Sequence, residues 1–203
     1  MNNAETQILR LCLKKQNMKL IKHTAQIFTI DHFCSLQECN ELIKYSNETG
    51  YSPATVNTHM GTKLLPDYRN NTRVFHTSNE LAETFWQKLQ PLFDTRIGNS
   101  VPIGFNELFR FYKYEPGQRF KKHRDSAYFR NDSEGSYYTF LLYLNEGYKG
   151  GEPAFENLVI TPKTGMALIF VHDLIHEGKE VKEGVKYVLR SDIMYRYMGD
   201  QDD

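Results

Sequence analysis

Two side chains with metal-binding chemistry, His123 and Asp125, lie two positions apart in the segment RFYKYEPGQRFKKHRD. On an extended chain, residues two apart point to the same side, so this imidazole and this carboxylate can each give one ligand to one metal ion. The later segment Val171–Gly178 (VHDLIHEG) offers a third ligand from His172 or His176. Two imidazoles and one carboxylate leave the other octahedral positions open, as in non-haem Fe(II) oxygenases. A lone His-x-Asp is a weak signal, so the surrounding residues must support this interpretation.

Short apolar and aromatic runs follow residue 104, and turn clusters rich in Gly, Pro and Asn separate them. Such runs predict strands. Many short strands with regular turns favour a sandwich or barrel, here a double-stranded β-helix or jelly roll. The predicted strands are Leu108–Tyr114, Ser136–Leu144, Met166–Val171 and Tyr187–Tyr197.

The part of the chain before residue 104 predicts helices. Ser35 and Glu38 form a capping-box pattern at the start of a helix over residues 35–47. A second amphipathic helix is expected over residues 79–93, after a polar stretch, residues 52–77, that reads as a long loop. A strand is expected at Gln26–Ile30. The predicted class is α+β, with the N-terminal helices packed on one face of the jelly roll.

Residues 1–23 read as an N-terminal arm or short helix, and residues 24–203 as a single domain. Lys plus Arg and Asp plus Glu both number 25, so the net charge is zero and no nucleic-acid partner is expected. Three cysteines form an odd set without a CxxC, which argues against a disulfide framework. No signal peptide or transmembrane segment is recognisable, so we expect no membrane partner and an intracellular, cytoplasmic location.

From about residue 105 to 197 the sequence resembles the catalytic core of the prolyl 4-hydroxylase-like branch of the 2-oxoglutarate/Fe(II) dioxygenases. The family pattern is His-x-Asp, a distant His, and a basic residue about ten positions later. His123 and Asp125 match the first pair, and His176 matches the distant ligand because Lys186 follows it by ten positions. His172 is the weaker candidate because that basic residue would come too late. The resemblance therefore implies that His123, Asp125 and His176 hold the iron.

The YLN segment that begins at Tyr143 and the GGE turn at Gly150–Glu152 also resemble the family. Pro153 departs from it, since relatives often carry Thr there. Asp125 favours hydroxylation, because halogenating relatives leave that position empty for halide. The resemblance implies an enzyme that hydroxylates a C–H bond, with Fe(II) as cofactor, 2-oxoglutarate and O2 as cosubstrates, and succinate and CO2 as products. A requirement for ascorbate is a further expectation.

The far carboxylate of 2-oxoglutarate needs a cation in a buried pocket, since an unpaired buried charge is costly. Lys186 is the first choice for that cation. Arg190 is the alternative, because residues 186, 188 and 190 alternate onto one face of one strand. Tyr114 and Tyr143 stand where tyrosines of the family share this pocket. Thr139 lies on the same strand face as Tyr143 and is expected to line the pocket without contacting the cosubstrate.

A prolyl or other side chain of a protein or peptide is the expected substrate, with contacts sought at Phe120, Arg69 and Arg73. A solvated charged turn is the preferred interpretation of the two arginines. Alternatives are the same chemistry on a small metabolite, a free amino acid or an alkylated nucleobase, the last disfavoured by the zero net charge. A non-catalytic jelly-roll binding module would have no reason to retain the three ligands. A zinc hydrolase would have no reason to retain Lys186.

Overall fold

The computed structural model describes residues 17–58 and 61–199. Within these residues two helices, α2 (Leu36–Thr49) and α3 (Asn79–Leu89), accompany short strands. The strands are β1 (Lys19–Lys22), β2 (Ile27–Asp31), β3 (Ser52–Pro53), β4 (Val56–Thr58), β5 (Gly61–Lys63), β6 (Thr72–Thr77), β7 (Ser100–Phe105), β8 (Leu108–Tyr114), β9 (Phe120–His123), β10 (Glu134–Tyr143), β11 (Lys149–Gly150), β12 (Pro153–Phe155), β13 (Ala167–Val171), β14 (His176–Gly178), β15 (Val181–Glu183) and β16 (Lys186–Tyr197).

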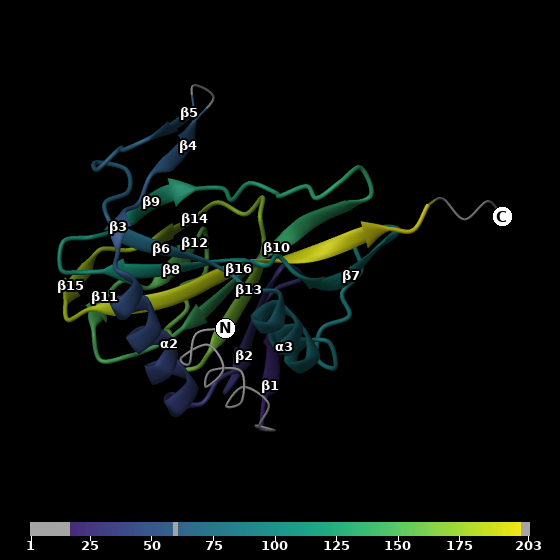
Figure 1. Cartoon of the computed structure of the whole chain (residues 1–203), viewed down its shortest axis with the longest axis horizontal. Helices are drawn as coiled ribbons and strands as arrows, with labels where there is room; N and C mark the ends of the chain where they lie inside the picture. The colour runs from purple at the N-terminus through teal and green to yellow at the C-terminus, as the bar shows by residue number, and fades with distance from the viewer. Residues whose placement is uncertain (1–16, 59–60, 200–203) are drawn as a thin grey trace.

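The strands form a large antiparallel sheet in the order β1-β2-β13-β10-β16-β8-β6-β3, with β7 also paired to β16. A small sheet, β12-β14-β9, lies over one face of it, where Phe170 of β13 contacts Phe155 of β12 and His176 of β14. The helices α2 and α3 lie on the opposite side (Figure 1). This is the expected α+β architecture, with a double-stranded β-helix core.

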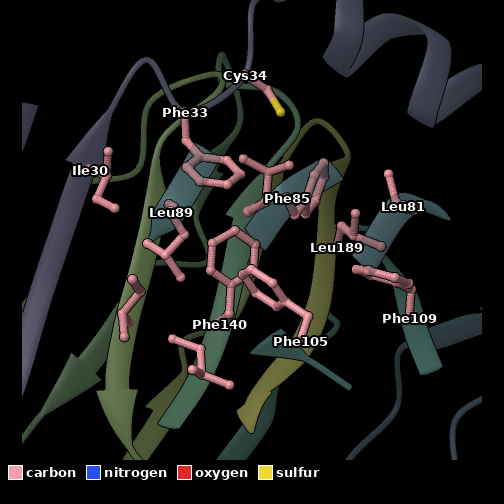
Figure 2. Close-up of a cluster of buried hydrophobic side chains, with 14 of the residues drawn as sticks. Ile30, Phe33, Cys34, Leu81, Phe85, Leu89, Phe105, Phe109, Phe140 and Leu189 are labelled. Carbon is pink, nitrogen blue, oxygen red and sulfur yellow. The ribbon is translucent and has the colours of Figure 1, made fainter. Parts of the chain in front are cut away.

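The strands of the large sheet alternate between two environments. On the helix side, Phe85 of α3 packs against Phe109 of β8 and Phe140 of β10, with ring centroids 5.8 and 6.0 Å apart (Figure 2). Leu189 of β16 belongs to the same buried cluster. The neighbouring residue Arg190 faces the small sheet instead. One set of strands therefore supplies both the hydrophobic core and the polar side chains beneath the small sheet.

The capping box at Ser35 is confirmed: the Ser35 hydroxyl accepts from the backbone of Glu38, whose carboxylate accepts from the backbone of Ser35. The second helix ends at Leu89 rather than at residue 93. Pro91 explains this difference, because a proline disfavours helical backbone at the residue before it and cannot donate a backbone hydrogen bond.

Residues 52–77 were expected to be a loop, and that prediction is wrong where β3, β4, β5 and β6 form within it. Thr72–Thr77 forms β6, which pairs with β8 near the edge of the large sheet. The polar composition hid this strand, because Arg73 lies over the ring of Phe75, which is itself 49% exposed. A strand with so little buried apolar surface lacks the pattern by which strands are recognised.

The N-terminal arm or helix predicted over residues 1–23 lies mostly outside the described residues, which begin at residue 17. Its last part, Lys19–Lys22, is β1, paired antiparallel with β2. Neither helix in the described part of the chain is long and apolar enough to cross a bilayer.

Gly165 joins the N-terminal segment to the sheet. Its carbonyl accepts from the amide of Cys34 at 3.1 Å, and its own amide donates to the carbonyl of Tyr143 at 2.8 Å. Its φ is +76°, and a Cβ there would lie 2.0 Å from the Cys34 carbonyl oxygen.

We expect Gly165→Ala to lower the free energy of unfolding by about 2–4 kcal/mol, measured by urea denaturation. Gly147→Ala is the matched control, because Gly147 has φ +87° in open space and should cost only about 1–2 kcal/mol. An equal cost at both positions would contradict the role of the close approach.

Candidate metal centre and adjoining pockets

The pairing of β9 with β14 brings two of the predicted residues face to face. His123 and His176 are direct cross-strand partners, and their ring centroids lie 4.2 Å apart. Asp125 follows two residues after His123, and its amide donates to the carbonyl of His172 at 3.0 Å. The candidate ligand atoms of His123, Asp125 and His176 all lie within 4.8 Å of one another. The structure thus brings together three side chains that are up to 53 positions apart in the sequence.

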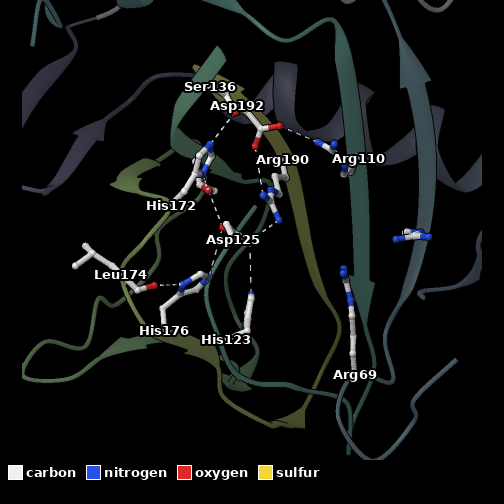
Figure 3. A network of polar contacts seen from close by, with 12 residues as sticks. Arg69, Arg110, His123, Asp125, Ser136, His172, Leu174, His176, Arg190 and Asp192 are labelled. Atoms are coloured by element: carbon white, nitrogen blue, oxygen red, sulfur yellow. Dashed lines mark hydrogen bonds and ion pairs between the residues drawn. The ribbon is translucent and has the colours of Figure 1, made fainter. Parts of the chain in front are cut away.

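Hydrogen bonds orient both imidazoles in the same way. Nδ1 of His123 contacts the carbonyl of Lys121 at 2.8 Å, and Nδ1 of His176 contacts the carbonyl of Leu174 at 2.9 Å. A carbonyl only accepts, so each Nδ1 carries the proton and each Nε2 keeps its lone pair. The two Nε2 atoms point toward Asp125, at 3.7 and 3.6 Å from its carboxylate oxygens (Figure 3).

The charge states of these groups suit a cation. Burial lowers the pKa of His123 to about 3, with a further contribution from His176. Burial also lowers the pKa of His176, which is therefore neutral at neutral pH. Burial alone would raise the pKa of Asp125, but the charge of Arg190 and the hydrogen bond from Thr139 hold it well below its usual range. Two neutral imidazoles and one carboxylate, all ready to donate lone pairs, match the donor set that Fe(II) accepts.

The carboxylate of Asp125 is held from both sides. Arg190 donates to Oδ1 at 2.7 Å, and the hydroxyl of Thr139 donates to Oδ2 at 2.6 Å. Asp192 is the second partner of Arg190, at 3.3 Å, and also contacts Arg110 at 3.2 Å. Arg190, a candidate for the cosubstrate site, therefore lies in an ion-pair network with two carboxylates (Figure 3).

His172, the weaker candidate for the third ligand, lies outside the cluster of ligand atoms but supports it. Its Nδ1 lies 2.8 Å from the hydroxyl of Thr139, and its Nε2 lies 2.9 Å from the hydroxyl of Ser136. Because Thr139 donates to the ionised Asp125, Thr139 must accept from His172, which then accepts from Ser136. This series of hydrogen bonds fixes Thr139 as a donor to Asp125 and an acceptor from His172. Thr139 was expected to line the pocket, and its contact with Asp125 was not foreseen.

A pocket next to the two imidazoles contains the other predicted residues, and Tyr114, Tyr143 and Lys186 all line it. The ammonium of Lys186 lies 5.0 Å from the ring centroid of Tyr114 and 5.5 Å from that of Tyr143. It donates to the carbonyl of Gly151 at 2.5 Å. The side chain of Lys186 forms no ion pair among the described residues. The hydroxyl of Tyr143 is also buried, and it has no hydrogen-bond partner among the described residues. A buried cation and an orphaned hydroxyl in one pocket fit a carboxylate ligand.

The residues predicted to contact substrate also lie beside the imidazoles, and Phe120 lines the Lys186 pocket as well. Phe120 stacks on the ring of His123, with centroids 3.5 Å apart and an interplanar angle of 16°. The guanidinium of Arg69 lies 4.4 Å from the Phe120 ring centroid. Arg73 of β6 lines the same cleft as Phe120 and Arg69. All three thus lie near the candidate metal ligands, and their roles remain predictions.

Comparisons with known proteins agree with this geometry. Residues 109–191 match the sequence profile of the 2OG-Fe(II) oxygenase superfamily. The chain is 24% identical over 215 residues to prolyl 4-hydroxylase 1 of Arabidopsis thaliana, covering 92% of this chain and 74% of that protein.

Solved structures share the fold. A Pseudomonas putida prolyl-4-hydroxylase superposes with a TM-score of 0.61 at 18% identity, covering 83% of this chain and 92% of that chain. A Trichoplax adhaerens prolyl hydroxylase, solved with a hypoxia inducible factor peptide fragment, gives 0.60 at 17% identity, with 95% and 93% covered. The viral collagen prolyl hydroxylase of Paramecium Bursaria Chlorella virus-1, solved with 2OG, gives 0.56 at 23% identity, with 84% and 96% covered.

Proposed function

Because this chain belongs to the 2OG-Fe(II) oxygenase superfamily, we propose that it hydroxylates a prolyl or other side chain of a peptide or protein, with release of succinate and CO2. The observation that carries the proposal is the cluster of His123, Asp125 and His176 beside the pocket that contains Lys186. Lys186 is buried and forms no ion pair with any of the described residues. The prolyl hydroxylases among its relatives support a peptide substrate. Residues 24–203 would form the single catalytic domain.

In this proposal the imidazoles of His123 and His176 and the carboxylate of Asp125 hold Fe(II). When bound with 2-oxoglutarate and O2, the iron supplies the oxidising chemistry that converts a C–H bond to an alcohol. Arg190 and Thr139 keep the carboxylate of Asp125 ionised and aimed at the imidazoles. These contacts prepare the three donors in advance, so little reorganisation is needed on metal binding.

Lys186 would pair with the far carboxylate of 2-oxoglutarate, and the Tyr143 hydroxyl would donate to the same group. Tyr114 would close the pocket beside the Lys186 ammonium and exclude water from the ion pair. Excluding water strengthens such a charge-assisted contact. Arg190 is the less favoured cation for this role, because Asp125 and Asp192 already engage its guanidinium.

The direct test is succinate formation from 2-oxoglutarate by the purified protein with Fe(II) and ascorbate, with and without proline-containing peptides. We expect slow turnover without peptide and faster turnover with an accepted peptide, accompanied by a 16 Da increase in peptide mass from the added oxygen, roughly the value for one hydroxylation. Zn(II) in place of Fe(II) should give no succinate. Absence of succinate under every iron condition would favour a non-catalytic binding module.

The charge of Lys186 makes 2-oxoglutarate binding depend on pH. Burial lowers the pKa of Lys186 to about 7, and Glu152 only partly opposes this effect. A bound carboxylate favours the charged ammonium, so binding should raise this pKa. The affinity for 2-oxoglutarate should therefore be highest below pH 7 and fall about tenfold per pH unit above it.

Titration calorimetry from pH 6 to 8.5, with Mn(II) to prevent turnover, measures this dependence. Lys186→Arg should flatten the profile, because arginine stays charged. An equally steep profile in that variant would contradict the assignment.

A further inference from the structure

A second cleft, of about 250 Å³, opens beside His123 and Asp125, and Lys186 is not among its lining residues. Its lining carries five arginines and one acidic residue, Asp125. We call it the arginine cleft, and its arginines are Arg69, Arg73, Arg110, Arg124 and Arg190. Such an excess of one charge at a proposed reaction centre, in a chain of zero net charge, indicates a selective role.

Three of these arginines already have carboxylate partners. Arg110 pairs with Asp192, Arg190 with Asp125 and Asp192, and Arg124 with Asp173. For Arg69 and Arg73, no carboxylate of the described residues lies within 4.0 Å. The positive charges of Arg69 and Arg73 therefore lack a counterion among the described residues.

Arg69 is a buried and well-held group, since only 5% of its surface is exposed. Its Nε donates to the side chain of Asn71 at 2.7 Å. Its guanidinium lies between the rings of Tyr112 and Phe120, at 4.6 and 4.4 Å from their centroids. One terminal nitrogen, Nη2, is buried without a hydrogen-bond partner in the described region. A buried charged donor left unpaired costs free energy that an anion in the cleft would recover.

The segment that carries Arg69 is fastened to β9, the strand that carries His123. The amide of Asn70 donates to the carbonyl of Arg119 at 3.3 Å, and the amide of Arg119 donates to the Asn70 side chain at 2.7 Å. The amide of Lys121 donates to the carbonyl of Tyr68 at 3.0 Å. Arg69 is therefore held in a fixed place relative to the imidazole of His123.

The electrostatic surroundings agree with a site for an anion. Burial alone would raise the pKa of Tyr112, yet Arg190, Arg69 and Arg110 hold it below its usual value. Burial lowers the pKa of Arg73, and the like charges of Arg69 and Arg110 lower it further. The positive charges thus act together on the groups between them, and a bound anion would relieve their repulsion.

We propose that the arginine cleft binds a carboxylate side chain of a peptide substrate, held by Arg69 and Arg73 next to the residue to be hydroxylated. This inference rests on the proposed function and adds a substrate class, acidic peptides. Two nitrogens of Arg73 already donate to Thr55, and Arg69 has one nitrogen without a partner in the described region. A single carboxylate is therefore enough to accept the remaining hydrogen bond of Arg69 and to serve as a counterion for these two arginines. The planar guanidinium fork suits carboxylate geometry.

The test uses four N-acetylated, C-amidated peptides, Gly-X-Pro-Y-Gly, in which X and Y are each Glu or Gln. Their dissociation constants are measured on the protein loaded with Mn(II) and 2-oxoglutarate, at low and high salt. We expect at least one Glu peptide to bind about tenfold or more tightly than the Gln/Gln peptide, as a charge-assisted contact provides. That preference should shrink at high salt.

Arg69→Gln and the half-buried Arg73→Gln should each remove most of the preference for Glu over Gln, measured as the ratio of dissociation constants within each variant. Arg196→Gln is the matched control, since Arg196 pairs with Glu134 near the far end of β16 and should keep the preference. Circular dichroism establishes whether each variant folds. Arg73 is only half-buried, so Arg73→Gln keeps the test valid if Arg69→Gln does not fold.

Equal binding of Glu and Gln peptides, or no binding of any peptide, overturns the inference. Succinate formation without peptide requires neither Arg69 nor Arg73 as a peptide-binding group, so it reports separately on the proposed function. Iron-dependent succinate formation together with equal peptide binding would leave the proposed oxygenase standing and remove only its preference for acidic peptides.

Discussion

Replacing His123 with alanine is expected to abolish Fe(II)-dependent consumption of 2-oxoglutarate, lowering it by at least about a hundredfold. Loss of even a hydrogen-bonding partner of a metal ligand costs up to about that factor, so loss of a ligand should cost no less. The metal affinity should fall with the activity. Calorimetric titration with Mn(II) measures the affinity, and succinate formation measures the turnover.

His123 is the best of the three positions for this test because its removal leaves no buried charge behind. Its pKa of about 3 makes it neutral, whereas Asp125→Ala would deprive the buried Arg190 of one of its two carboxylates. We therefore expect His123→Ala to fold, with a loss of stability of about 1–2 kcal/mol. His23→Ala, outside both cavities, is the control and should retain full turnover. Undiminished metal binding by His123→Ala would remove this imidazole from the proposed ligand set.

Lys186→Ala is expected to raise the concentration of 2-oxoglutarate needed for half-maximal rate by about a hundredfold or more. Truncating one partner of a buried charge pair costs about 2–5 kcal/mol, which corresponds to roughly 30- to several thousand-fold in affinity. Since the proposed partner is the far carboxylate and not the reacting end of the cosubstrate, the rate at saturating 2-oxoglutarate should change much less. Steady-state kinetics at increasing 2-oxoglutarate separates the two parameters.

Arg190→Gln serves as the comparison for this experiment. It should disturb Asp125 and so lower the maximal rate, with a smaller effect on the 2-oxoglutarate requirement. The reverse pattern, with a large change in the requirement for Arg190→Gln and a small one for Lys186→Ala, would exchange the two assignments.

Strand alternation allowed much of the site to be predicted from the sequence. Residues 186, 188 and 190 were expected on one face of a strand, and Lys186, Val188 and Arg190 do line the same pocket. Period-two patterns predict such features because each strand faces an apolar core on one side. The pairing of His123 with His176 was instead expected from the resemblance to the dioxygenase family, and the two residues pair directly across β9 and β14.

The remaining features depend on local irregularities and on pairing between distant segments. Simple alternation would place Ser136 on the same face as Tyr138 and Phe140, in the core. A bulge between Ser136 and Tyr138 shifts the register of β10, so that Ser136 and Thr139 both face His172. One extra residue in a strand leaves no clear mark in the sequence, and for this reason His172 seemed an ordinary histidine.

Arg69 was also hard to interpret from its neighbours in the sequence. The sequence favoured a solvated charged turn for the cluster Arg69–Arg73, yet Arg69 is buried between Tyr112 and Phe120. Its burial follows from the attachment of residues 68–70 to the segment 117–122, nearly fifty positions later. Contacts of such long sequence separation are not encoded in local periodicity.

The division of β16 between two environments makes this strand intolerant of insertions. Adding one amino acid between Val188 and Leu189 would send every side chain on one flank of the insertion to the opposite surface of the sheet. Arg190 and Asp192 would be driven among the phenylalanines, and Leu189 would be turned toward the imidazoles. Folding and reactivity would then fail together, so β16 can diversify by substitution but not by changes in length.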